Sequence, residues 1–161
     1  MKTLGAPIRI QIVNQSSQAR LPMTRLRKLV AQILKHLGFR KGILSVAILD
    51  DAGIRPMNRR YLKHDRATDV MAFGYAGCDP FGVLGDIAIS AETVRRQAVR
   101  YGHSFFYELV FCLCHGILHL SGMEDRTVRG KRGMDRRQTA ILKSIGVTPL
   151  FFKNNKNKKG V

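Results

Sequence analysis

Hydrophobic and polar residues follow a two-residue period near the start of the chain. Within residues 8–12, three isoleucines alternate with Arg and Gln, which is typical of a strand with one buried face. A continuous apolar run at 43–49 has the length of a strand, and stretches rich in β-forming residues follow at 68–75 and 83–89. The pattern therefore predicts four strands.

A 3.6-residue period predicts helices in the segments between and after these strands. Apolar residues recur at helical spacing over 22–37, and a short helix is expected at 53–62. A helix at 91–100 follows a serine that can cap it. Residues 104–120 are apolar almost all round, which indicates a buried helix. The last helix is expected at 134–145, before a glycine.

Length and composition fit one globular domain. The chain has 161 residues, of which 45% are hydrophobic and 24% charged, so it can bury a core without a second domain. We place this domain at residues 1–150. No run of eighteen apolar residues and no leader-like apolar stretch occur, so no membrane partner is expected.

Charge points to a polyanionic partner. Lys and Arg number 28 against 11 Asp and Glu, a formal charge of +17, which favours nucleic acid first and an anionic membrane second. Residues 126–161 contribute eleven of the cationic residues and a single acid. Within them, 151–161 has the composition of a basic disordered tail.

The cysteines indicate a reducing compartment. Cys78, Cys112 and Cys114 are odd in number, and two lie within an apolar helical stretch where bridging is difficult, so we interpret them as free thiols of a cytoplasmic protein. The cluster Cys112-x-Cys114-His115 lacks C-x-x-C spacing. Packing in the core is the better interpretation.

The stretch from His115 to Asp125, His-Gly-Ile-Leu-His-Leu-Ser-Gly-Met-Glu-Asp, has the spacing of a metal site. His115 and His119 are one helical turn apart, within about 40° of each other around the axis. Gly122 permits the chain to leave the helix, so that Asp125 can return as a third ligand. Two imidazoles, a carboxylate and an open position form a known catalytic zinc arrangement. In the competing interpretation, Asp125 caps the next helix and Glu124 is the reserve ligand.

Several blocks of the sequence resemble the YbeY family of bacterial rRNA maturation factors, which are metal-binding endoribonucleases. The resemblance spans roughly residues 45–145 and keeps the family's order and spacing. The matching stretches are Thr68-Asp-Val-x-x-Phe73, Leu84-Gly-Asp-Ile87, Gln97-Ala98, Tyr101-Gly-His103, Glu108-Leu109 and His115-Gly-x-Leu-His-Leu-x-Gly122.

The resemblance implies a fold and a function. The fold would be a single small α+β domain, with helices around a four-stranded mixed sheet and a central buried helix that carries the metal motif. The function would be metal-dependent cleavage of ribosomal RNA in ribosome biogenesis, in the cytoplasm. One divalent metal is expected, with zinc favoured, and the partners would be ribosomal RNA, pre-ribosomal particles and ribosomal proteins.

Two departures from the family pattern bear on activity. The family's third histidine falls on Asp125, and its Tyr-Arg pair is Tyr61-Leu62 here, followed by Ala67 where the family has proline. The arginine associated with the phosphate is therefore absent. The substitutes that lie nearby in the sequence are Arg59, Arg60, Lys63, His64 and Arg66.

An anionic third ligand has a chemical consequence. It lowers the net charge of the metal centre, which becomes a weaker Lewis acid and acidifies its water less. It also widens the plausible metals from zinc toward manganese or iron. We therefore expect the nuclease activity to be lowered by Leu62, which stands in place of the arginine, and by Asp125, which stands in place of the histidine.

Three functions are compared. RNA hydrolysis requires proton transfer, for which His64, Asp86 and Glu124 are candidates, although Asp69 and Asp86 fit a role in fixing loops better. A metallopeptidase is disfavoured because Gly116 stands where such enzymes carry a glutamate base. A non-catalytic, metal-stabilised RNA-binding assembly factor is the alternative that the two departures favour.

Overall fold

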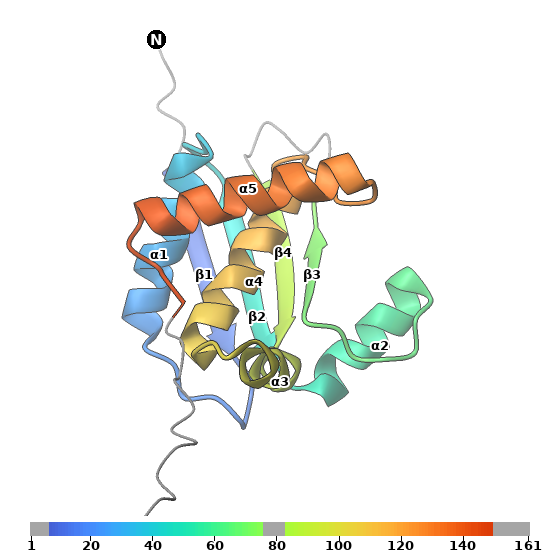
Figure 1. Ribbon diagram of the computed structural model, residues 1–161. Helices are drawn as coiled ribbons and strands as arrows, with labels where there is room; N and C mark the ends of the chain where they lie inside the picture. Colours follow the sequence, from blue (N-terminus) through green and yellow to red (C-terminus); the bar gives the residue numbers. More distant parts are fainter. Residues whose placement is uncertain (1–6, 76–82, 150–161) are drawn as a thin grey trace, which may run out of the picture.

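A single mixed sheet forms the centre of the molecule. The computed structural model describes residues 7–75 and 83–149. The strand order is β1-β2-β4-β3, in which β1, β2 and β4 are parallel and β3 pairs with β4 in the antiparallel sense at one edge (Figure 1). The strands are β1 (Arg9–Asn14), β2 (Ile43–Leu49), β3 (Val70–Phe73) and β4 (Val83–Ser90).

Helices cover the two faces of this sheet unequally. One face carries α4, with α1 beside it and α5 crossing over it, whereas α2 packs on the other face (Figure 1). The helices are α1 (Met23–His36), α2 (Asp51–Leu62), α3 (Ala91–Tyr101), α4 (Phe105–Leu120) and α5 (Val128–Ser144). The predicted α+β class with a four-stranded mixed sheet is confirmed.

The central helix α4 is buried because its apolar residues reach the sheet, α1, α3 and α5 at once. Leu109, Leu113 and Ile117 are 0% exposed, and each such side chain contributes roughly 1.5–3 kcal/mol through burial. Gly116 faces the sheet, where an added Cβ would lie 3.2 Å from side-chain atoms of both Val70 and Ile87. A small residue at position 116 therefore lets α4 approach β3 and β4 closely.

The predicted elements are present, with four shifts of boundary. The first strand, expected at 8–12, runs from Arg9 to Asn14. The strand expected at 68–75 is limited to β3, at whose start the Asp69 side chain accepts the Val70 N–H at 2.7 Å. The second helix begins at Asp51, two positions earlier than predicted. The last helix begins at Val128, six positions earlier than predicted, because its basic first turns have no apolar period to reveal them.

Other predictions concern the caps, the cysteines and the tail. Ser90 caps α3 as predicted, accepting the Thr93 N–H at 3.3 Å. Cys112 and Cys114 are free and buried, and burial raises the pKa of the Cys114 thiol to about 12. Cys78 and the tail at 151–161 lie outside the described residues. Within the described ranges no single helix is long and apolar enough to cross a membrane; α3 and α4 pass that test only as a pair bent by 114°.

Candidate metal centre

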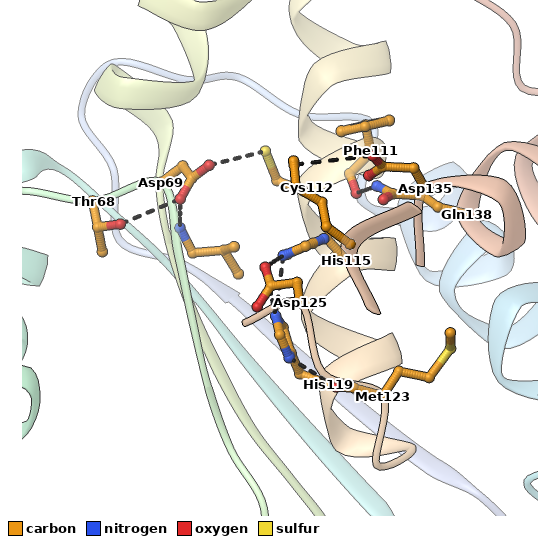
Figure 2. Close-up of polar contacts among 12 residues, drawn as sticks. Thr68, Asp69, Phe111, Cys112, His115, His119, Met123, Asp125, Asp135 and Gln138 are labelled. Carbon is orange, nitrogen blue, oxygen red and sulfur yellow. Dashed lines mark hydrogen bonds and ion pairs between the residues drawn. The ribbon is translucent and has the colours of Figure 1, made fainter. Parts of the chain in front are cut away.

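The last turn of α4 places two histidines side by side. Nε2 of His119 lies 3.1 Å from Nε2 of His115, as helical spacing predicts (Figure 2). Their side chains are 25% and 32% exposed for His115 and His119, so they lie at the rim of the buried helix and not within its core. A ligand from outside the helix can therefore reach both rings.

The chain reverses directly after these histidines. Gly122 adopts a φ of +93°, and its N–H donates to the His119 carbonyl at 3.0 Å. The following loop lies tight against α5, where a Cβ on Gly130 would come within 2.5 Å of the Glu124 carbonyl. Thr127 caps α5 by accepting the Gly130 N–H at 3.0 Å. The interpretation of Asp125 as the cap is therefore wrong.

This reversal brings the Asp125 carboxylate back to the histidines. Its Oδ2 lies 3.4 Å from Nε2 of His115 and 3.7 Å from Nε2 of His119 (Figure 2). One ligand atom from each of the three residues falls within 4.8 Å of the others. Glu124, the reserve ligand, is exposed and outside this group.

Hydrogen bonding and burial prepare both imidazoles as ligands. Nδ1 of His119 lies 3.1 Å from the Met123 carbonyl, to which it donates its hydrogen, so the lone pair on Nε2 faces the group. Burial lowers the pKa of His115, with His119 acting in the same direction, while Asp125 and Asp69 oppose the shift. The neutral, metal-binding form of His115 is favoured as a result.

The donor set fits a divalent cation. Two imidazole nitrogens and one carboxylate oxygen converge. Because the hydrogen of the His119 ring is on Nδ1, its Nε2 offers a lone pair to the neighbouring atoms. A cation between the three atoms would accept lone pairs from all of them together. His115, His119 and Asp125 could thus hold zinc, or a harder ion such as manganese or iron.

Most of the chain is similar to known proteins. The chain matches the family described as Endoribonuclease YbeY over residues 11–146. The chain belongs to the YbeY family. It is similar to Endoribonuclease YbeY of Geobacter metallireducens, 38% identical over 150 residues that cover 87% of this chain and 99% of the relative. It is also similar to Endoribonuclease YbeY of Moorella thermoacetica, 43% identical over 114 residues that cover 65% of this chain and 73% of the relative.

The fold has a solved counterpart. The solution structure of TM1509 from Thermotoga maritima is similar with a TM-score of 0.59 at 22% identity, over 94% of this chain and 99% of that one. The likeness concerns the fold alone. The family match over residues 11–146 confirms the resemblance to the YbeY family that the sequence motifs indicate.

The structure also locates the departures from the YbeY pattern. Asp125, which stands where the family pattern has a third histidine, lies beside His115 and His119. Leu62 is the last residue of α2 and 55% exposed. The five substitutes named for the missing arginine are also exposed, on the second half of α2 and the loop after it: Arg59, Arg60, Lys63, His64 and Arg66.

The proton-transfer candidates do not gather at the metal group. Asp86 lies on the opposite face of the sheet, where it accepts a hydrogen bond from the Tyr75 hydroxyl and lines a cavity of about 240 Å³ beside Met57 of α2. His64 is exposed beyond the end of α2. Of the three, Glu124 alone neighbours a ligand in the chain.

A second cavity, of about 260 Å³, adjoins His115. We name it the acidic cavity because Asp69, Glu108, Asp125 and Asp135 line it. Sequence reasoning assigned Asp69 to fixing a loop, and it does so by accepting the Val70 N–H at 2.7 Å. Its carboxylate also faces this space, which the sequence could not indicate.

Gln138 is the residue at this site that sequence reasoning missed. It is 0% exposed on α5 and lines the acidic cavity. Its Nε2 donates to the Phe111 carbonyl at 2.7 Å, and its Oε1 has no partner of hydrogen-bond geometry (Figure 2). Gln138 lies close enough to His115 to oppose the lowering of that residue's pKa. The available signal was a polar residue on the apolar face of the last helix, one turn after Met134.

Proposed function

We propose that this protein is a metal-dependent endoribonuclease whose divalent ion is held by His115, His119 and Asp125. The observation that carries the proposal is the convergence of the three ligand atoms within 4.8 Å beside an open cavity. Membership of the YbeY family supports cleavage over a purely assembly-related role. We propose zinc as the resident ion, since two imidazoles and a carboxylate suit it.

The roles of the residues follow from the donor set. A bound divalent ion supplies Lewis acidity toward a phosphoryl oxygen or a water molecule. His115 and His119 each present a neutral Nε2, and Met123 keeps the His119 ring in that orientation through its carbonyl. Asp125 contributes negative charge, which weakens that Lewis acidity. Glu124, next to the ligand in the chain, is the proposed proton acceptor.

The glutamate base of metallopeptidases has no counterpart at its usual position in this chain. The position after the first histidine, where metallopeptidases carry glutamate, is Gly116, which packs against Val70 and Ile87 of the sheet. A side chain there would point into the core and not toward the ion.

The proposed substrate is ribosomal RNA, in pre-ribosomal particles of the cytoplasm and in contact with ribosomal proteins. The charge of +17 supports an RNA substrate. Helix α5, which begins two residues after Asp125, exposes a basic surface that can neutralise phosphates near the ion. This α5 basic surface consists of Arg129, Lys131, Arg132, Arg136 and Arg137.

The test combines metal analysis with cleavage. Elemental analysis of purified protein should give nearly one zinc per chain, and His115→Ala should lose it. Cleavage of a structured ribosomal RNA fragment should fall with the metal, whereas His36→Ala, at an exposed histidine that ends α1, should retain both. Metal-free wild-type protein would overturn the site, and equal cleavage by His115→Ala would overturn the nuclease assignment.

A further inference from the structure

The acidic cavity contrasts with the charge of the whole protein. The chain carries +17, yet Asp69, Glu108, Asp125 and Asp135 line this space against a single lysine, Lys131. Even with Asp125 engaged by a metal and Asp135 beside Lys131, the carboxylates of Asp69 and Glu108 remain, and Oε2 of Glu108 lies 2.7 Å from Nδ1 of His103. Because like charges repel at close range, we expect the Asp69 carboxylate to disfavour a phosphate group beside it. A neutral or cationic occupant is favoured.

The cavity also presents more acceptors than donors. Gln138 is 0% exposed, its Nε2 is used by the Phe111 carbonyl, and its Oε1 has no partner of hydrogen-bond geometry. Oδ2 of Asp69 accepts from Nε2 of Gln97 at 3.1 Å, and Sγ of Cys112 lies 4.0 Å away. That thiol has a single hydrogen and an alternative acceptor, Oε1 of Gln97 at 3.8 Å, so Oδ2 can accept from a further donor. A buried acceptor without a donor is costly, so the fitting ligand is one that carries N–H groups.

A second metal ion fits these groups poorly. Throughout residues 7–75 and 83–149, no group of three His, Cys, Asp or Glu side chains other than His115, His119 and Asp125 is close enough to share an ion. The remaining acids come from separate elements: Asp69 precedes β3, Glu108 lies on α4 and Asp135 on α5. A volume of about 260 Å³ approaches the roughly 300 Å³ at which small-molecule sites begin. The space suits a flat organic group.

Resting on the proposed function, we propose that the acidic cavity receives one unstacked base of the RNA strand and prefers guanine. Guanine offers two adjacent N–H donors, N1–H and the N2 amino group, to carboxylate and amide oxygens. Adenine and cytosine offer an amino group alone, and uracil offers N3–H without an amino group. The base would reach Asp69 and Gln138, while its phosphate stays outside.

The rim of the cavity carries groups for the rest of the nucleotide. Tyr101 lines the cavity and is 53% exposed, so its ring can stack on the base as it enters. The Lys131 side chain is 66% exposed and lies 3.9 Å from Asp135, where it can meet the phosphate. His115 joins the same cavity to the metal group, so a base held there brings the adjoining phosphodiester toward the ion.

The test uses zinc-loaded full-length protein and two measurements. Cleavage rates are compared for four single-stranded RNAs that differ at one nucleotide, and binding of the four ribonucleoside monophosphates is followed by NMR. We expect the guanine substrate to be cut about tenfold faster than the uracil one, as loss of a charge-assisted hydrogen bond implies. GMP should bind more tightly than UMP.

Matched variants separate the cavity from the rest of the surface. Asp69→Asn and Tyr101→Ala should reduce the guanine preference several-fold and leave the zinc content unchanged. Asp86→Asn, a carboxylate on the other face of the sheet, and Tyr61→Ala, a tyrosine that is 54% exposed on α2, should retain the preference. Circular dichroism confirms that each variant is folded.

The outcomes for the base site and for the nuclease are distinct. Equal cutting of all four RNAs by the wild type, or equal binding of GMP and UMP, overturns the base site while the nuclease stands. A zinc-loaded protein that cuts none of the RNAs overturns the nuclease, and the monophosphate titration then decides the base site. Two metal ions per chain, with no monophosphate bound, would assign the cavity to a second cation.

Discussion

Asp125 meets His115 across the turn that ends α4, with 3.4 Å between Oδ2 and Nε2. The contact depends on the turn at Gly122 and on Thr127, which starts α5 in place of Asp125. A carboxylate held in this way is available to a cation. It stands where the YbeY pattern has a third histidine, so its identity sets the charge of the centre.

Substitutions of Asp125 should distinguish its contribution to zinc affinity from its effect on the Lewis acidity of the ion. Asp125→Ala should weaken zinc binding by more than the roughly 10–100-fold lost with a residue that only orients a ligand. Asp125→His should keep zinc and raise the rate of RNA cleavage, because a neutral ligand leaves more positive charge on the ion. Competition with a chromophoric chelator measures the affinity, and Asp135→Ala on α5 serves as control. Undiminished zinc affinity in Asp125→Ala would remove this residue from the site.

The metal-free protein should lose stability as the medium becomes acidic. Burial holds the pKa of His115 below its usual value of 6.5 in the folded state, so the unfolded chain binds more protons between that lowered pKa and 6.5. The contribution of His115 is complete above pH 6.5 and disappears as pH falls through this window. Urea unfolding from pH 8 to pH 5 should show the slope in wild type and a smaller slope in His115→Gln. An unchanged slope in that variant would contradict the assignment.

Gly85 should tolerate no side chain. It adopts a φ of +148°, and an added Cβ would lie 2.4 Å from the Phe73 carbonyl oxygen and 2.7 Å from Cδ2 of Leu120. Gly85→Ala should reduce the free energy of unfolding by about 2–5 kcal/mol, through backbone strain and overpacking together. Gly102→Ala, at a φ of +70° with nothing within 4 Å, isolates the backbone cost of about 1–2 kcal/mol. Equal losses in the two variants would show that packing at Gly85 is unimportant.

The α5 basic surface should contribute to RNA affinity in a salt-dependent way. Arg132→Gln combined with Arg136→Gln removes two exposed charges, and the slope of log affinity against log salt should fall by about 0.7–0.9 for each phosphate that is no longer neutralised. Fluorescence anisotropy at several salt concentrations measures the slope. The pair Arg27→Gln and Lys28→Gln on α1 controls for net charge. An equal decrease of the slope in both pairs would make the effect one of overall charge alone.

The sequence predicts helices and strands correctly where burial imposes a regular spacing of apolar residues. The apolar stripe at 22–37 and the run at 43–49 predict α1 and β2 closely, because each buries one face or both. The first turns of α5 are basic and exposed, and their cap at Thr127 is the feature that marks the true start. Local pattern therefore fails where a helix begins without a buried residue.

The residues of the site likewise fall into those that the sequence pattern predicts and those that it does not. His115, His119 and Asp125 are close in the chain, so helical spacing and a glycine suffice to predict their convergence. Asp86 is a candidate for proton transfer by sequence, but the alternation of side chains along β4 sends it to the opposite face. Gln138 reaches the site only through the packing of α5 on α4, a long-range contact that the sequence pattern does not contain.

The three proposed ligands lie close together in the chain: His115 and His119 on the last turns of α4, and Asp125 in the short loop that joins α4 to α5. Closing loops this short costs little chain entropy, and the helices on either side are held by the core. We therefore expect protein emptied of the proposed ion by a chelator to keep its sheet and central helix and to bind metal again without refolding. In a cell, the working fraction of such molecules would follow the supply of the metal and not the stability of the fold.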